Sequence, residues 1–228
     1  MKKQNILMIV VFTLLFINSK GQSWGIMAGS NFSNLLVKID NQIPNDYYNF
    51  KPGIHVGIDA NIPVSRFISL EPSLILSEKG NDFHYQETNY TLNSRLSLYY
   101  LDIPIYANLF YDIGHKRKIY VLIGPYLEIG LKGKIKREEI ESGETHTEII
   151  DLDWGYNKYQ DYVNINRLGV GLSFGAGFEK KSFFIGISYD LGISNNSAYL
   201  KEDNFSIKNR VIKLSLGKKF KINTIRYY

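Results

Sequence analysis

Histidine is the residue type in this chain best suited to acid–base or metal chemistry, and its four copies are scattered. His55 falls on a predicted strand, His84 and His146 lie in long polar segments, and His115 lies in a short turn. No HExxH, paired-histidine or nucleophile-elbow pattern occurs, and cysteine is absent. The sequence therefore predicts a non-enzymatic protein with no catalytic residue, no metal site and no cofactor.

The segment 137–164 is the better candidate for a binding site, because its acidic residues are followed by aromatic ones. Exposed aromatic side chains beside carboxylates can bind a protein partner, a glycan or a divalent cation, and function often lies on loops held by a rigid scaffold. Its first part could extend as a hairpin that turns at 141–144. The alternative is a solvated loop that shields the end of the fold. The candidate partner-binding residues are Glu138, Glu139, Glu141, Glu144, Glu148, Asp151, Asp153, Trp154, Tyr156, Tyr159 and Tyr162.

The element that organises the rest of the chain is the stretch Tyr99–Tyr111, YYLDIPIYANLFY. Every second residue from Tyr99 is apolar, and a tyrosine stands at each end. Because side chains alternate between the two faces of a strand, this pattern predicts a strand with one apolar face. At about 3.3 Å per residue it is roughly 40 Å long, enough to cross a membrane when tilted.

The same alternation predicts seven further strands, at 24–32, 53–62, 68–77, 119–132, 168–178, 183–193 and 212–220. Long polar loops are expected at 38–49, 79–94, 134–164 and 194–208, and short turns at 63–66, 112–118 and 179–182. Long loops on one side and short turns on the other are typical of small outer-membrane barrels. The predicted fold is all-β, an eight-stranded antiparallel up-and-down transmembrane β-barrel of OmpA/OmpX-like architecture, with both termini on the short-turn, periplasmic side.

The apolar face is expected to point outward, into lipid. An eight-stranded interior has little room for bulky apolar side chains from every strand. The opposite face is rich in glycine and serine, which would leave space for inward tyrosines such as Tyr100, Tyr106, Tyr120 and Tyr126. Aromatic residues also stand at the ends of the apolar faces, as in the belts at membrane interfaces.

Charged residues of both signs then fall on the inward face, where buried charges must be compensated. The sequence predicts a hydrogen-bonded polar network that fills the barrel, and a proton or solute path is the alternative. The predicted network consists of His55, Asp59, Glu71, Asp102, Tyr106, Tyr126, Glu128, Lys132, Asp190 and Lys213.

The N-terminus is typical of a secretory signal peptide. Two lysines precede the apolar run Ile6–Ile17, and Ser19 and Gly21 suit cleavage before Gln22. We therefore expect a signal peptide at 1–21 and one barrel domain at 22–228. Removing the three lysines of the signal lowers the formal net charge from +5 to +2, which offers no clustered basic surface for nucleic acid.

Several segments carry a resemblance to a known family: FKPGIHVGIDANIPVSRFISLEPSLILSEKG, LYYLDIPIYANLFY, IYVLIGPYLEIGLKGK, LGVGLSFGAGFE and KNRVIKLSLGKKF. They resemble the PorT-like outer-membrane β-barrel family of Bacteroidetes. The resemblance implies an eight-stranded barrel in the outer membrane and a link to secretion and gliding machinery, but no catalytic motif. Such barrels usually end at the aromatic residue of the last strand, so either Phe220 or Tyr228 could serve as the signal for barrel insertion.

The expected function is a structural or partner-binding role in the cell envelope of a Gram-negative bacterium. A narrow small-solute channel is one alternative, and a lipid-modifying site in which His55 approaches Ser77 or Glu78 is a weaker one. The expected partners are outer-membrane lipid, the barrel-insertion machinery and secretion or envelope proteins, with a monomer as the expected state.

Overall fold

The computed structural model of the chain describes residues 22–39, 48–141, 144–155, 164–198 and 205–221. The predicted signal peptide at 1–21 and the tail at 222–228 lie outside these residues. No helix in the described part of the chain is long and apolar enough to cross a membrane.

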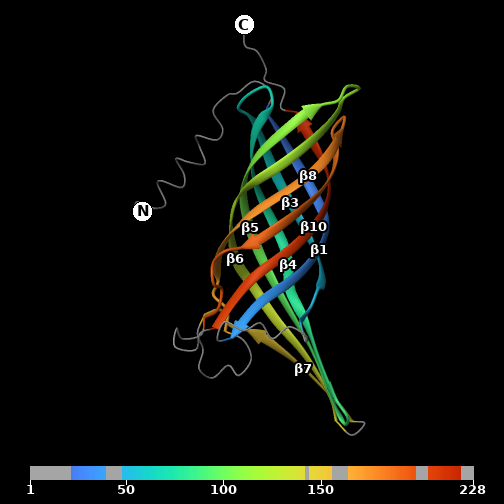
Figure 1. Ribbon diagram of the computed structural model, residues 1–228, viewed down its shortest axis with the longest axis vertical. Coiled ribbons are helices and arrows are strands. Elements are labelled where there is room, and N and C mark those ends of the chain that lie inside the picture. Colours follow the sequence, from blue (N-terminus) through green and yellow to red (C-terminus); the bar gives the residue numbers. More distant parts are fainter. Residues whose placement is uncertain (1–21, 40–47, 142–143, 156–163, 199–204, 222–228) are drawn as a thin grey trace, which may run out of the picture.

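Eight long strands close into a ring in which every pair of neighbours is antiparallel (Figure 1). The order around the ring is β3, β4, β5, β6, β8, β9, β10, β1 and back to β3. This confirms the predicted eight-stranded barrel. The eight strands are β1 (Ser23–Ile39), β3 (Lys51–Pro63), β4 (Ile68–Glu87), β5 (Tyr90–Asp112), β6 (Arg117–Glu141), β8 (Leu168–Lys180), β9 (Phe183–Gly192) and β10 (Phe205–Lys221). Two shorter strands, β2 (Tyr48–Asn49) and β7 (Glu144–Leu152), pair with β4 and β6 outside the ring.

The outer surface of the ring is apolar, as the alternation predicts. Ile54 on β3, Ile123 on β6 and Ile185 on β9 are each more than half exposed. The intervening residues of the same strands, such as His55 and Phe184, are buried inside. Because lipid is the only solvent in which so many large apolar side chains can be exposed together, this surface is the membrane-facing one.

Glycines on the inner face leave space for large aromatic side chains. A Cβ atom added at Gly171 would collide with the ring of Tyr126, and one added at Gly177 or Gly186 would collide with Tyr120. The prediction that inward tyrosines fill this space is confirmed for these two rings. The interior is therefore packed rather than open.

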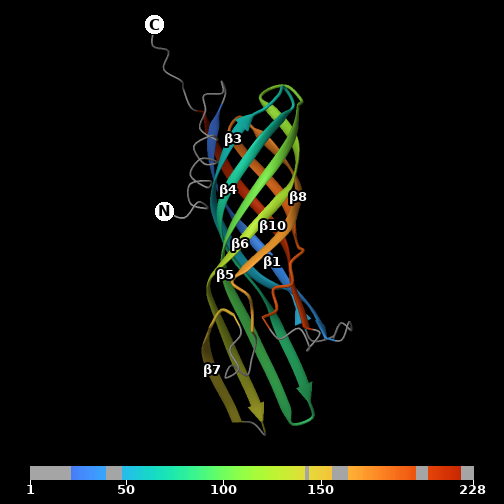
Figure 2. The same ribbon diagram turned by 90° about the vertical axis from the view of Figure 1, so that its left-hand side faces the viewer.

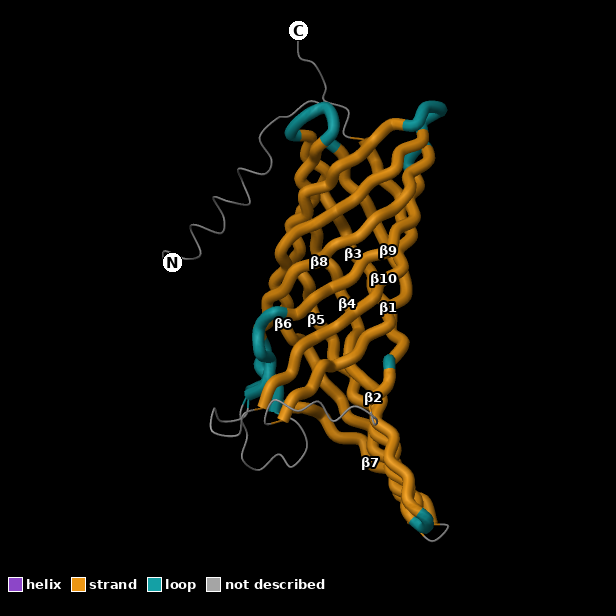
Figure 3. The backbone as a smooth tube through the Cα atoms, viewed as in Figure 1, coloured by secondary structure: helices purple, strands orange, loops and turns teal. Residues whose placement is uncertain are grey.

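The two ends of the barrel differ (Figure 3). At one end, short turns join β3 to β4, β5 to β6 and β8 to β9, and β1 begins and β10 ends there. Outer-membrane barrels have their short turns in the periplasm, so this is the expected periplasmic end. Trp24 and Phe220 stack at this end with their ring centroids 4.4 Å apart, in the position of an interfacial aromatic pair.

At the other end, the strands β4, β5, β6 and β7 continue beyond the ring as a projecting sheet (Figure 2). The prediction of a loop at 79–94 was wrong, because β4 runs to Glu87 and β5 begins at Tyr90. The two strands remain paired out to Glu87 and Tyr90. Beyond the membrane both faces of a sheet meet water, so these strands lack the apolar alternation from which strands were predicted.

A β-bulge on β6 marks the base of the projecting sheet. Tyr99 of β5 pairs with Lys132 and Tyr100 pairs with Gly130, which leaves Leu131 as the extra residue. A bulge shifts the side-chain alternation by one residue. Lys132 consequently points outward, with its side chain 56% exposed, so its predicted place in the interior network was wrong. The shift also turns Ile135 inward, where it is buried.

The orientation of the barrel wall is tested by placing the same charge on two exposed isoleucines. Ile123→Arg puts a guanidinium on the lipid-facing wall, and we expect it to lower the free energy of unfolding by about 2–4 kcal/mol. Ile149→Arg on β7 is the control, because this side chain is 66% exposed on the projecting sheet. We expect Ile149→Arg to change the free energy of unfolding by no more than about 0.5 kcal/mol. Urea unfolding in phospholipid vesicles measures both, and equal costs would contradict a lipid-facing wall.

Candidate functional site

The centre of the interior is an ion cluster built on Lys79 of β4. Its ammonium lies 2.7 Å from a carboxylate oxygen of Asp102 on β5 and 2.8 Å from one of Glu128 on β6. The rings of Tyr100 and Tyr126 flank it, with centroids 5.1 and 5.3 Å from the nitrogen. A lysine with no exposed surface is stable as a cation only in such a setting, where carboxylates and aromatic faces replace water.

A second lysine joins this cluster to the opposite wall. The ammonium of Lys213 on β10 lies 3.0 Å from Asp102 and 2.6 Å from Asp190 on β9. Asp102 thus bridges the two lysines from its two oxygens. The side-chain amides of Asn196 and Asn209 each donate a 2.7 Å hydrogen bond to Glu128. The cluster therefore links strands from around the ring.

Two further sets of polar side chains interact in the interior. His55 contacts Asn31 through Nδ1 at 2.7 Å and Ser215 through Nε2 at 2.9 Å. Nearer the periplasmic end, Lys219 binds Glu71 at 2.7 Å, and Asn108 donates to the same carboxylate at 2.8 Å.

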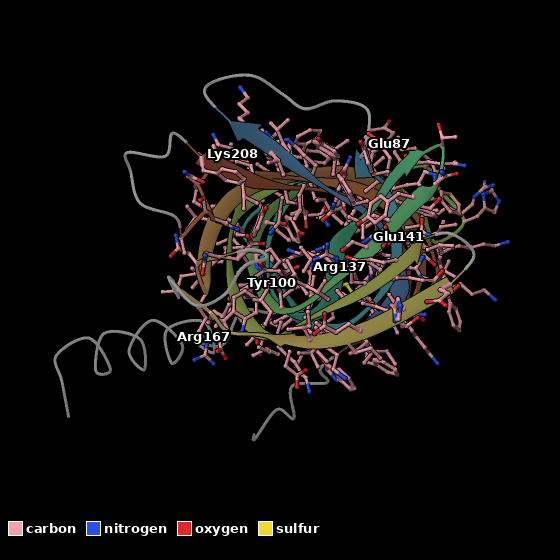
Figure 4. All side chains as sticks on the ribbon, turned by 90° about the horizontal axis from the view of Figure 1, so that it is seen from below. Glu87, Tyr100, Arg137, Glu141, Arg167 and Lys208 are labelled. Carbon is pink, nitrogen blue, oxygen red and sulfur yellow. The ribbon has the colours of Figure 1, made fainter. Side chains whose placement is uncertain are left out.

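The end of the barrel beneath the projecting sheet is closed by an apolar plug. Trp154 packs edge-on against Tyr100, with ring centroids 5.6 Å apart, and a Cβ at Gly130 would meet its indole. Ile165, which is 1% exposed, forms a bridge with Trp154. Figure 4, viewed from this end, shows Tyr100 among the side chains that fill the ring. The buried members of the plug are Leu35, Val37, Leu96, Leu98, Tyr100, Ile135, Leu152, Ile165 and Ile207.

The structure places nine residues of the predicted network inside the barrel, and Lys132 outside it. The nine buried residues are His55, Asp59, Glu71, Asp102, Tyr106, Tyr126, Glu128, Asp190 and Lys213. Sequence reasoning missed Lys79, because it was assigned to a polar loop. The signal was present, since Lys79 continues the inward alternation of Glu71, Ser73 and Ser77.

The residues of the predicted 137–164 loop have three different placements. Glu138, Glu139 and Glu141 lie on β6, and Glu144, Glu148 and Asp151 lie on β7. These six residues belong to a paired hairpin, which confirms the hairpin predicted for the first part of this segment. Asp153 is exposed, whereas Trp154 faces the plug and is not an exposed binding aromatic. Tyr156, Tyr159 and Tyr162 lie outside the described residues.

The geometry around His55 gives no support to a lipid-modifying site. His55 and Ser77 are register partners on β3 and β4, and Asn31 contacts both. His55 is 3% exposed inside the ring, where neither lipid nor water has access to it from the outer surface. In the part of the chain that the structure describes, no group of three or more His, Cys, Asp or Glu side chains is arranged to hold a metal ion.

A family model described as outer membrane protein beta-barrel domain matches residues 18–198. The chain belongs to this family. Its place in the outer membrane follows from this membership together with the apolar outer wall. A comparison with curated proteins found no match.

Several solved outer-membrane proteins are similar to the chain in fold. The attachment invasion locus protein Ail of Yersinia pestis is 16% identical over 89% of this chain and 100% of its own, with a TM-score of 0.37. Neisserial surface protein A is 12% identical over 89% and 100%, with a TM-score of 0.41. OprG from Pseudomonas aeruginosa is 10% identical over 89% and 97%, with a TM-score of 0.40. Likeness at this level carries no argument about activity.

Removing the central cation should destabilise the barrel strongly. Lys79→Met leaves Asp102 and Glu128 buried without their shared lysine. We expect this change to lower the free energy of unfolding by about 3–5 kcal/mol. Lys132→Met is the matched control, because Lys132 is exposed and its distance to Asp151 is 3.7 Å. The control should lose at most about 1 kcal/mol. Urea unfolding of both variants measures the difference. Similar losses of unfolding free energy would show that the ion cluster stabilises the barrel no more than an exposed ion pair does.

The plug and the ion cluster lie in series across the lumen, so the folded protein should not conduct ions. Purified protein in planar bilayers is expected to give no unitary current steps, while a porin in the same bilayers gives the positive control. Discrete steps from the pure protein would favour the channel alternative instead.

Proposed function

We propose that the chain is a non-enzymatic outer-membrane barrel whose projecting sheet binds a partner protein with a basic surface. The sheet stands beyond the membrane-facing ring, and its strands are held by continuous backbone pairing between β4, β5, β6 and β7. A paired sheet loses less conformational freedom on binding than a flexible loop does. It therefore suits the presentation of a binding surface.

The observation that carries this proposal is the charge of the distal half of the sheet. Residues 84–94 and 138–148 contain six glutamates and no lysine or arginine. Nearer the barrel, Lys136 and Arg137 lie 4.0 and 2.6 Å from Glu138 and Glu139, respectively. Arg95 pairs with Asp82 at 2.8 Å, and this side-chain hydrogen bond raises the pKa of Arg95.

Three glutamates at the far end remain without such cations. Among the described residues, no lysine or arginine nitrogen lies within 4.0 Å of Glu87, Glu141 or Glu144. Figure 4 shows Glu87 and Glu141 at the ends of the projecting strands. Because complementary charge steers association, an acidic tip favours a partner with a basic surface.

The resemblance of the barrel segments to PorT-like proteins supports the narrower proposal that the partner is a secretion or envelope protein. No contact in the described structure favours one such protein over another, so partner capture is the decisive experiment.

The test neutralises the tip and measures partner capture from native outer membranes by crosslinking. The variant Glu87→Gln, Glu141→Gln, Glu144→Gln should lose most of the partner captured by the unaltered protein. Capture by the unaltered protein should also weaken between about 0.15 and 1 M salt, where the Debye length falls from about 8 to 3 Å.

The matched control is Thr88→Gln, Thr145→Gln, Thr147→Gln, which alters three exposed residues of the same tip without changing charge. This variant should retain the partner. If the glutamate variant captures the same protein to the same extent, the acidic tip is not the binding surface.

A further inference from the structure

The periplasmic end of the lumen contains a cavity of about 440 Å³, here called the vestibule. It lies between the ends of β1, β3, β5, β6 and β10 and the turn that joins β8 to β9. Its charged lining consists of five lysines and one glutamate, namely Lys118, Lys181, Lys218, Lys219, Lys221 and Glu179. Its volume lies within the range of about 300–1,000 Å³ that is usual for ligand pockets.

Four of these lysines have no carboxylate neighbour in the part of the chain that the structure describes. Lys219 alone has carboxylate neighbours, with Glu71 at 2.7 Å and Glu179 at 3.7 Å. No carboxylate of the described residues lies within 4.0 Å of the ammonium groups of the other four. The vestibule therefore concentrates positive charge in a concave space, which raises the local concentration of anions.

One of the unpaired lysines is held in place by an aromatic ring that faces the vestibule. Lys118 lies over Phe110, 4.8 Å from the ring centroid. Lys218 lies over the outward-facing rings of Phe183 and Phe220, 5.1 and 5.2 Å from their centroids, so its ammonium group is on the outer side of β10. A ring face attracts an ammonium group but leaves its N–H donors available for an oxyanion.

The inner wall adds a hydrogen-bond acceptor. Asn108 is 2% exposed and lines the vestibule, and its amide nitrogen donates to Glu71. Its carbonyl oxygen has no hydrogen-bond partner among the described residues. An unpartnered buried acceptor suits a ligand hydroxyl group.

Among the described residues, side chains separate the vestibule from the rest of the lumen. Tyr120 and Lys219 line both the vestibule and a deeper cavity of about 50 Å³, so they form the wall between the two. Lys213 lines the deeper cavity and belongs to the ion cluster, and the apolar plug closes the far end. A ligand that enters from the periplasm must leave by the same opening.

From these observations we propose that the vestibule binds a phosphate-bearing anion on the periplasmic side of the membrane. Lysine ammonium groups bind phosphate oxygens through charge-assisted hydrogen bonds. The phosphate can belong to a soluble compound or to the headgroup of an anionic lipid of the inner leaflet. The two sources share this chemistry, and the experiment separates them.

The experiment is isothermal titration calorimetry on the full mature protein folded in uncharged detergent. Sodium tripolyphosphate is the soluble probe, dihexanoyl phosphatidylglycerol is the lipid probe, and dihexanoyl phosphatidylcholine is the lipid without net charge. Binding of tripolyphosphate assigns the site to soluble phosphates. Binding of phosphatidylglycerol, without binding of tripolyphosphate or phosphatidylcholine, assigns it to anionic lipid.

Two variants with equal loss of charge decide whether the vestibule is the site. Lys118→Gln, Lys181→Gln, Lys221→Gln removes three vestibule lysines and should weaken binding more than about tenfold. Arg66→Gln, Lys116→Gln, Lys180→Gln removes three exposed cations of the same end that do not line the vestibule, and should change affinity less than about twofold. Circular dichroism and heat-modified gel mobility check that both variants are folded.

The proposal is overturned if neither probe binds, or if the vestibule variant binds as tightly as the unaltered protein. It is also overturned if both variants lose affinity equally, because that result indicates a diffuse field and not a site. The projecting sheet lies at the opposite end of the barrel, so these outcomes are independent of the partner-binding test.

Discussion

Compensation of charge inside a closed ring is the constraint on which the rest of this structure depends. With the outer wall committed to lipid, every charged side chain of the membrane-spanning strands must point inward, where water is scarce. Lys79 and Lys213 satisfy this constraint by sharing Asp102 and by binding Glu128 and Asp190. The partners come from five different strands, so the same ion pairs that neutralise the charges also tie the ring together across its lumen.

This filled interior leaves the two ends as the places where the protein can meet other molecules. Their charges are opposite: the tip of the projecting sheet is rich in glutamate, and the periplasmic vestibule is rich in lysine. The formal net charge of the whole chain conceals this separation. The packed barrel thus carries two surfaces of opposite charge at its two ends.

The barrel could be predicted from the sequence because the membrane imposes a strict alternation, and strands such as Tyr99–Tyr111 follow it without interruption. The projecting sheet could not be predicted in the same way, since water on both faces removes the alternation from 79–94. Lys79 was missed because the polar run that begins with it was assigned to a loop, although the inward set of β4 leads to it. Lys132 was misplaced because one extra residue at Leu131 shifts the alternation, and nothing in the sequence marks a bulge there. The side chain of Trp154 points inward because it packs against Tyr100, which is distant in the sequence. No local sequence pattern predicts such a contact.

The bulge at Leu131 also bears on how such a protein could change over evolutionary time. On its membrane side, the outward residues of β6 must be apolar, and on its outer side they are Lys132, Lys134 and Lys136. The register of the outer segment is thus set at the bulge and not by the membrane. Hairpins beyond this point could be lengthened, shortened or exchanged in steps of two residues while the wall stays intact. The barrel wall is then constrained by the membrane, whereas the exposed hairpins are free to change in length and sequence.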